Sequence, residues 1–145
     1  MEIKELGHVV LYVTSLEKVG TFYRDVLGFE VVGEIPGFMA FSGGRTHHEL
    51  LLIEIGGESQ KRGVRPGLYH IGFKVGNTLE ELKAAIRKCE SKGVPIQGIA
   101  DHHVTNSLYV LDPDGNELEL YVDVSDEWKR NPQAILQPAK RLKLE

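Results

Sequence analysis

The feature that most constrains this sequence is an internal pseudo-repeat, in which two successive stretches carry the same order of signals. The first stretch opens with the strand-like run ELGHVVLYV (5–13), and the second opens with GLYHIGFKV (67–75). A helical segment follows each run. Three more strand-like runs follow each helix, near 29–34, 38–42 and 48–55 in the first stretch and near 94–99, 106–111 and 117–123 in the second. The order predicts two βαβββ modules.

Capping signals and glycines delimit the two predicted helices. A threonine followed three residues later by a glutamate, the spacing of a capping box, occurs at 14–17 and again at 78–81. Apolar residues then fall on one helical face, namely Val19, Phe22, Tyr23, Val26 and Leu27 in the first helix and Leu82, Ala85, Ile86 and Cys89 in the second. Gly28 and Gly93 are the expected helix ends, because helices often stop at a residue in the left-handed conformation.

The length of 145 residues favours one domain. We expect this domain to span 1–124, with module one at about 4–57 and module two at about 66–124, joined by a Gly- and charge-rich linker at 55–67. Residues 125–145 are expected to form a C-terminal extension, with a short helix and a basic, mobile end that serves as a lid or a tail.

Composition and charge exclude several classes of protein. With 17 Lys and Arg against 21 Asp and Glu, the net charge is −4, which disfavours nucleic acid and anionic membranes as partners. Cys89 is the single cysteine, so no intrachain disulfide or cysteine zinc site can form, which favours a reducing, cytoplasmic location. No secretory signal is expected at the start of the chain, and no apolar run approaches the ~20 residues of a membrane span.

Strand alternation places one metal-competent side chain opposite an apolar face in each of three predicted strands. These side chains are His8, His70 and Glu119. Two imidazoles and one carboxylate suit a divalent metal that keeps open positions for substrate. His8 and His70 also occupy the same place in the repeat, for which a structural role gives no reason. The other interpretation, polar residues on the wet face of half-buried strands, stays open on spacing alone.

The order of elements, together with LGHVVLYV, FYRDVLGF, GLYHIGFKV and LYVLDPDGNELELY, resembles the vicinal oxygen chelate superfamily over roughly residues 4–124. This superfamily includes glyoxalase I, fosfomycin resistance proteins, methylmalonyl-CoA epimerase, bleomycin-binding proteins and extradiol ring-cleaving dioxygenases. The resemblance implies an α+β fold in which paired βαβββ modules form an open, cleft-containing, barrel-like mixed sheet. It also implies that His8, His70 and Glu119 are the metal ligands. The bleomycin-binding branch has this fold without the metal.

A possible fourth ligand separates the branches. Glyoxalase I-like members take a second carboxylate from the last strand of the first module. Aligning HELLLIEI (48–55) with NELELYVD (116–123) places Leu51 opposite Glu119, and leucine cannot bind a metal. A three-residue slip would place Glu54 there instead, on the other face of the strand. The better local match favours Leu51, and therefore two histidines and one carboxylate.

The segment ADHHVTNSLYVLDPDGN (100–116) is similar to that of ring-cleaving dioxygenases, in which a His and a strand Tyr precede the DPDG turn. The resemblance implies that His102 transfers protons and that Tyr109 holds a substrate oxygen by a hydrogen bond. His103 and Tyr121 are further candidates for substrate binding, and Trp128 for a lid over the cleft mouth. The alternative for His103 is a solvated loop residue.

The resemblance therefore implies a dioxygenase that uses Fe(II), or Mn(II), on a small vicinal diol such as a catechol. The alternatives are a glyoxalase-like lyase or isomerase with Ni(II) or Zn(II) and Glu54, and a non-enzymatic small-molecule binding protein of the bleomycin-resistance type. No Lys or Arg lies between Lys92 and Lys129, which disfavours binding of the phosphonate of fosfomycin. A single module pair also suggests a homodimer in which a partner chain completes the cleft.

Overall fold

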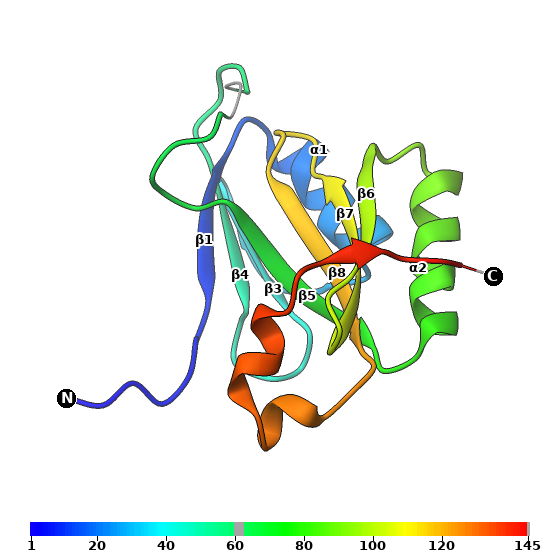
Figure 1. Cartoon of the computed structure of the whole chain (residues 1–145). Helices are drawn as coiled ribbons and strands as arrows, with labels where there is room; N and C mark the ends of the chain where they lie inside the picture. Colours follow the sequence, from blue (N-terminus) through cyan, green and yellow to red (C-terminus); the bar gives the residue numbers. More distant parts are fainter. Residues whose placement is uncertain (60–62, 145) are drawn as a thin grey trace. The chain divides into compact units, whose positions relative to one another are not determined.

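The computed structural model describes residues 1–59 and 63–144. It divides into two compact units, unit 1 with Met1–Lys61 and Pro113–Gly115, and unit 2 with Arg62–Asp112 and Asn116–Glu145. Each module forms a mixed sheet of its own with few helices (Figure 1), so the predicted α+β class is confirmed. The predicted linker lies at the division between the units, and its residues 60–62 fall outside the described residues.

Unit 1 contains a four-stranded sheet in the order β1-β4-β3-β2. Its elements are β1 (Val9–Val13), α1 (Leu16–Thr21), the π-helical turn η1 (Phe22–Val26), β2 (Glu30–Ile35), β3 (Phe38–Ser42) and β4 (Leu50–Glu54). Strand β1 runs parallel to β4, and the other pairs are antiparallel. Helix α1 packs on β3 and β4, where the side chains of Val19, Phe41 and Leu52 are fully buried.

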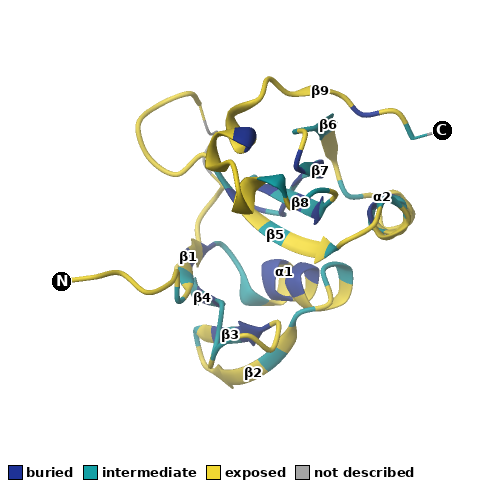
Figure 2. Ribbon diagram, turned by 60° about the horizontal axis from the view of Figure 1, so that its bottom comes forward, coloured by how far each residue is buried: buried dark blue, intermediate teal, exposed yellow. Residues whose placement is uncertain are grey.

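Unit 2 contains a five-stranded sheet in the order β5-β8-β7-β6-β9. Its elements are β5 (His70–Gly76), α2 (Leu79–Ser91), β6 (Ile96–Asp101), β7 (Thr105–Leu111), β8 (Glu117–Asp123), the 3-10 helices η2 (Glu127–Lys129) and η3 (Pro132–Leu136), and β9 (Lys140–Arg141). Strand β5 is parallel to β8. Helix α2 packs on β5, β7 and β8, and one side of it is buried while the other is exposed (Figure 2).

The predicted alternation is clearest in β8. Leu118, Leu120 and Val122 are buried under α2 and its neighbours, whereas Glu117, Glu119 and Tyr121 are half-buried on the opposite face. The apolar face supplies the hydrophobic stabilisation, at roughly 25 cal/mol per Å² of buried apolar surface. The opposite face is therefore left for polar side chains.

The capping box predicted at 14–17 is wrong. Ser15 is the N-cap of α1, and its side chain accepts a hydrogen bond from the Lys18 amide. Thr14 is engaged elsewhere, because both its backbone N–H and its hydroxyl donate to the Asp114 carboxylate, each at 2.7 Å. The Glu54 carboxylate accepts the amide of Leu16 at 2.6 Å and completes the cap.

The second capping box and both glycine stops are confirmed. The Thr78 hydroxyl accepts the Glu81 amide at 3.3 Å, and the Glu81 carboxylate accepts the Asn77 amide at 2.8 Å. Gly28 and Gly93 follow the two helical segments with φ of 77° and 66°, a conformation that favours glycine. The hydrogen bonds of Thr78 and Glu81 provide partners for backbone N–H groups at the start of α2, which would otherwise be unpaired.

We expect Thr78→Ala to lower the free energy of unfolding by about 1 kcal/mol, because it removes the N-cap acceptor of α2. The matched Thr78→Ser variant keeps the hydroxyl and is expected to stay near wild type. Urea denaturation followed by circular dichroism measures both. Equal stability of the alanine and serine variants would show that the cap contributes nothing.

The C-terminal extension contains short helical segments, as predicted, and it also forms a strand. The extension forms the 3-10 helices η2 and η3, and β9 then pairs antiparallel with β6, Arg141 opposite Ala100. Pro132 and Pro138 explain the short helices, since proline removes an amide donor and blocks a longer helix. Ala134 and Leu142 are buried, so this segment packs within unit 2. Within the described residues, no helix has the length and apolar character that crossing a membrane requires.

Candidate functional site

A pair of metal-competent side chains lies where β5 and β8 run side by side in unit 2. Gly72 pairs with Glu119 in the parallel register, which sets His70 and Glu119 on neighbouring strands. The Nε2 atom of His70 lies 3.1 Å from Oε2 of Glu119, and both side chains are mostly buried. Two of the three predicted metal ligands are thus brought together.

The other oxygen of Glu119 faces β7. Its Oε1 accepts a hydrogen bond from the Ser107 hydroxyl at 2.6 Å and one from the Tyr109 hydroxyl at 3.2 Å. The Tyr109 hydroxyl also lies 2.7 Å from Nε2 of His102. The predicted catalytic residues His102 and Tyr109 therefore belong to the same cluster as His70 and Glu119.

The environment of Tyr109 keeps its hydroxyl protonated. Burial raises the pKa of this hydroxyl, and the charge of Glu119 and the hydrogen bond to it raise the pKa further. When the hydroxyl donates to Glu119, Nε2–H of His102 donates to the hydroxyl oxygen in turn. The three side chains then form a continuous hydrogen-bonded path from His102 to Glu119.

The pair His70 and Glu119 fits a divalent metal. Ligand atoms about 2.1 Å from one ion and on adjacent positions lie about 3 Å apart, close to the observed separation. Ser107 and Tyr109 engage only Oε1 of Glu119, so Oε2 stays directed at His70. Across 1–59 and 63–144, no three His, Cys, Asp or Glu side chains gather closely enough to hold an ion.

The third predicted ligand, His8, belongs to unit 1 and is exposed. It directly precedes β1, just as His70 stands at the start of β5. Its ring centroid lies 4.4 Å from that of His48 and 6.2 Å from that of His47. His47 and His48 are themselves linked, with their Nδ1 atoms 2.6 Å apart. Unit 1 therefore carries a cluster of three imidazoles around its predicted ligand.

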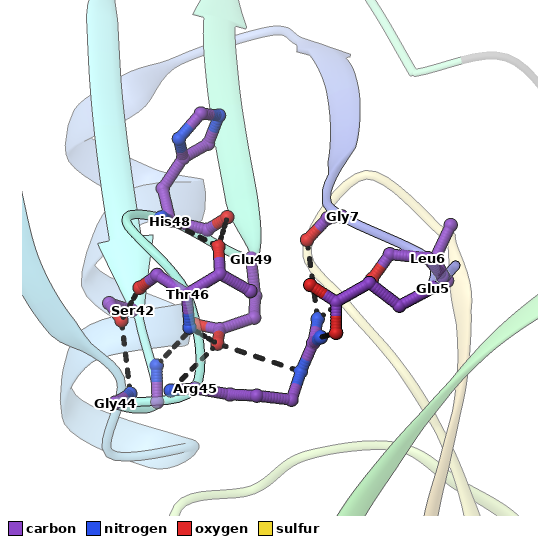
Figure 3. A network of polar contacts seen from close by, with 10 residues as sticks. Glu5, Leu6, Gly7, Ser42, Gly44, Arg45, Thr46, His48 and Glu49 are labelled. Carbon is purple, nitrogen blue, oxygen red and sulfur yellow. Dashed lines mark hydrogen bonds and ion pairs between the residues drawn. The ribbon is translucent and has the colours of Figure 1, made fainter. Parts of the chain in front are cut away.

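A network of polar contacts holds the backbone around this cluster (Figure 3). The Glu49 carboxylate accepts the amides of Gly43, Arg45 and Thr46 at 2.6, 3.0 and 2.8 Å. Burial raises the pKa of Glu49, but these hydrogen bonds outweigh it and hold the pKa below its ordinary value. Thr46 in turn accepts the amide of His48 at 3.2 Å. The loop that carries His47 and His48 is thus built around the half-buried Glu49 carboxylate.

Arg45 links the same loop to the segment before β1. Its guanidinium donates to the carbonyl oxygens of Leu6 and Gly7 at 2.9 and 3.2 Å, and to the Glu5 carboxylate at 3.2 Å. Gly7 immediately precedes His8. Figure 3 shows these bonds converging on one side chain. Arg45 therefore restrains the backbone that leads into His8.

Strand pairing supports the alignment that places Leu51 opposite Glu119. Val10 pairs with Leu51 in unit 1 as Gly72 pairs with Glu119 in unit 2. The Glu54 carboxylate, the alternative ligand, is hydrogen-bonded at the start of α1. The position equivalent to Glu119 in unit 1 is thus apolar.

The remaining predicted residues lie around unit 2 in different settings. Tyr121 shares the polar face of β8 with Glu119, and burial raises the pKa of its hydroxyl. His103 adopts a φ of 71° and bonds through Nε2 to Glu127 at 2.8 Å. Trp128 stands in η2 with 43% of its surface exposed. Substrate contact by these three residues stays a prediction.

Ser107 is a site residue that the sequence analysis missed. It is fully buried and donates to Glu119, yet a serine in a strand carries no signal of its own. Strand alternation would have found it, because Ser107 stands two residues before Tyr109 and shares its face. Its burial at the centre of β7 is possible because Glu119 accepts a hydrogen bond from its hydroxyl.

The sequence matches the Glyoxalase/Bleomycin resistance protein/Dioxygenase superfamily over residues 5–120. It is 35% identical to biphenyl-2,3-diol 1,2-dioxygenase 3 of Rhodococcus globerulus over 120 residues, 81% of this chain and 63% of that protein. It is 33% identical to catechol-2,3-dioxygenase of Bacillus subtilis over 138 residues, 90% of this chain and 46% of that protein. The chain thus spans about half to two thirds of the length of these relatives.

Solved structures show the same fold. An integron cassette protein from the mobile metagenome of the Halifax Harbour sewage outfall is 26% identical and superposes with a TM-score of 0.63, over 83% of this chain and 99% of that one. Sequence, paired βαβββ modules and fold similarity agree. This chain belongs to the Glyoxalase/Bleomycin resistance protein/Dioxygenase superfamily.

Proposed function

We propose that this protein is a metal-dependent dioxygenase of the extradiol type that acts on a small vicinal diol. The observation that carries the proposal is the cluster of His70, Glu119, Tyr109 and His102 in unit 2, linked by contacts of 2.7 to 3.2 Å. The cluster combines two metal-competent groups with a hydroxyl donor and an imidazole. The names of the two curated relatives, both diol dioxygenases, support the same reaction class.

We propose His70 and Glu119 as two ligands of a divalent metal, Fe(II) or Mn(II), and His8 as the third. His8 enters through the family resemblance and through its equivalence to His70 in the repeat. A metal bound by two histidines and one carboxylate would act as a Lewis acid and as a template that orients the substrate. This ligand set favours a vicinal diol as substrate, because the two adjacent oxygens of the diol would fit two adjacent open coordination positions of the metal.

The side chains around the ligands would handle protons and orientation. The His102 imidazole would accept a proton from a substrate hydroxyl through the ring nitrogen that is not bonded to Tyr109, and would return it later. The Tyr109 hydroxyl would hold a substrate oxygen by a hydrogen bond. Its contact with Glu119 fixes the position of both side chains. Ser107 would keep Oε1 of Glu119 away from the metal.

The engagement of Glu54 disfavours the glyoxalase-like alternative. A four-ligand site of that kind needs a carboxylate from β4, and the register places Leu51 there. The Glu54 carboxylate meanwhile satisfies the amide of Leu16 at the start of α1. Recruiting Glu54 would therefore cost that hydrogen bond and a change of strand face.

Oxygen uptake tests the proposal. Protein loaded with Fe(II) under anaerobic conditions is mixed with catechol or with biphenyl-2,3-diol in an oxygen electrode. We expect oxygen consumption together with a yellow ring-cleavage product, and loss of both in Glu119→Gln. A metal-loaded protein that consumes no oxygen with either diol, but turns over a glutathione hemithioacetal, would contradict the proposal in favour of the lyase class.

A further inference from the structure

His70 has an unpaired atom on the side away from Glu119. Its Nδ1 is buried and has no hydrogen-bond partner among the described residues. The nearest carboxylate oxygen is Oε1 of Glu117, 3.8 Å away. That distance is too long for a hydrogen bond, and closing it requires a movement of about 1 Å in a flexible side chain.

The strand register of the sheet places Glu117 beside His70. The two residues are directly paired in the parallel register of β5 and β8. Glu117 and Glu119 project from the same face of β8, so their carboxylates flank the imidazole on its Nδ1 and Nε2 sides. Both glutamates are largely shielded, with 22% and 18% of their side chains exposed. The imidazole is thus held between two carboxylates.

Tyr69 restrains the Glu117 carboxylate by a hydrogen bond. A hydrogen bond to Glu117 is the main cause that raises the pKa of the Tyr69 hydroxyl. The Tyr69 ring also lies against His70, with the two centroids 4.6 Å apart. Glu117 is therefore restrained by Tyr69, whose ring packs against His70.

The equivalent glutamate of unit 1 is used differently. Glu49 pairs with the start of β1 as Glu117 pairs with the start of β5, since the Val9 amide donates to the Glu49 carbonyl oxygen. Its carboxylate, however, accepts three loop amides. In unit 2 the turn before β8 is closed instead by Asp112, which accepts the Asn116 amide at 2.8 Å. The Glu117 carboxylate is therefore left facing His70.

We propose that Glu117 is a positioning residue that orients His70 for metal binding by accepting the hydrogen bond of its Nδ1–H. The inference rests on the proposed metal centre. A histidine that binds a metal through Nε2 carries its proton on Nδ1, and a buried N–H without an acceptor is costly. A carboxylate acceptor fixes the tautomer and the ring orientation and makes Nε2 a better ligand. The loss of such an acceptor typically costs 10–100-fold in metal affinity, as a rough guide.

Zn(II) binding, measured by competition with a chromophoric chelator, tests the inference without turnover. We expect Glu117→Ala to weaken Zn(II) binding by about 10–100-fold, and Glu117→Gln, which keeps a carbonyl acceptor, to weaken it less. Tyr69→Phe should cause a smaller loss than Glu117→Ala. Glu90→Ala, an exposed glutamate on α2, is the matched control and should bind like wild type. Circular dichroism checks that each variant is folded.

Nitrogen-15 NMR of the histidine rings in the Zn(II)-loaded protein gives a second measurement. We expect a slowly exchanging Nδ1–H on His70 in wild type, and rapid exchange of that proton in Glu117→Ala. If Glu117→Ala binds Zn(II) like wild type while His70→Ala does not, the positioning role is wrong and the metal centre stands. If wild type and His70→Ala bind Zn(II) equally, the proposed metal centre fails and the role of Glu117 fails with it.

Discussion

Replacement of Glu119 by glutamine is expected to lower the affinity for divalent metal by more than about 100-fold. This loss is larger than the one expected from a residue that only orients a ligand. Glu119 is the anionic member of the proposed ligands, and its Oε2 lies 3.1 Å from Nε2 of His70. An amide in its place cannot neutralise the ion. It would also present its NH₂ group either to His70 or to the hydroxyls of Ser107 and Tyr109. Isothermal titration with Mn(II) measures the change.

The Glu119→Gln variant should remain folded, since the two side chains are nearly isosteric and the Ser107 hydroxyl can rotate. Glu90→Gln makes the same chemical change on the exposed face of α2 and should bind Mn(II) like wild type. Unchanged Mn(II) affinity in Glu119→Gln would remove this residue from the ligand set. It would also remove the main support for the proposed function.

Asp114→Ala is expected to lower the free energy of unfolding by about 3 kcal/mol, because it leaves several hydrogen-bond donors without their charged acceptor. The Asp114 side chain is buried and accepts the amide and hydroxyl of Thr14, each at 2.7 Å, and the hydroxyl of Ser59 at 2.8 Å. Denaturation at neutral pH measures the loss. Asp126→Ala, at an exposed ion pair, should change stability by less than about 0.5 kcal/mol.

The effect of Asp114 depends on pH in a defined direction. Burial raises the pKa of this carboxyl, but the hydrogen bonds from Thr14 and Ser59 outweigh it and leave the pKa below its ordinary value. A depressed pKa contributes stability above the unfolded-state pKa of about 3.9, and this stability is lost as the pH falls through the folded-state pKa. The difference between wild type and Asp114→Ala should therefore shrink in acid. A constant difference down to low pH would contradict the assigned charge.

The repeat and the alternation of side chains predicted most of this fold. His70, Glu119, Tyr109 and His102 converge in unit 2 because a period of two fixes strand faces and because parallel pairing of β5 with β8 follows from the βαβββ order. The same logic predicted the buried positions Leu118, Leu120 and Val122. Local periodicity was sufficient in β8, where one face is wholly apolar and buried.

Contacts between residues far apart in the sequence could not be predicted from local periodicity. Thr14 had the spacing of an N-cap, but its amide and its hydroxyl both donate to Asp114, a hundred residues later in the sequence. Ser15 is the N-cap of α1 instead. Glu54 was the less favoured candidate for a metal ligand, and its hydrogen bond from the Leu16 amide could not be predicted from the sequence. The short strand β9 consists of two basic residues that closely follow Pro138, which together carry no strand signal. In each case the deciding partner is distant in sequence.

The metal content of protein purified without added metal, compared between wild type and His8→Ala, tests the proposed centre most directly. His8, in unit 1, is the proposed third ligand, and it takes part in none of the contacts that build the His70 and Glu119 pair in unit 2. We predict a single divalent ion per chain in wild type, and near-complete loss of that ion in a folded His8→Ala protein. A wild type without metal, or a His8→Ala variant that keeps its full metal content, would contradict the three-ligand centre.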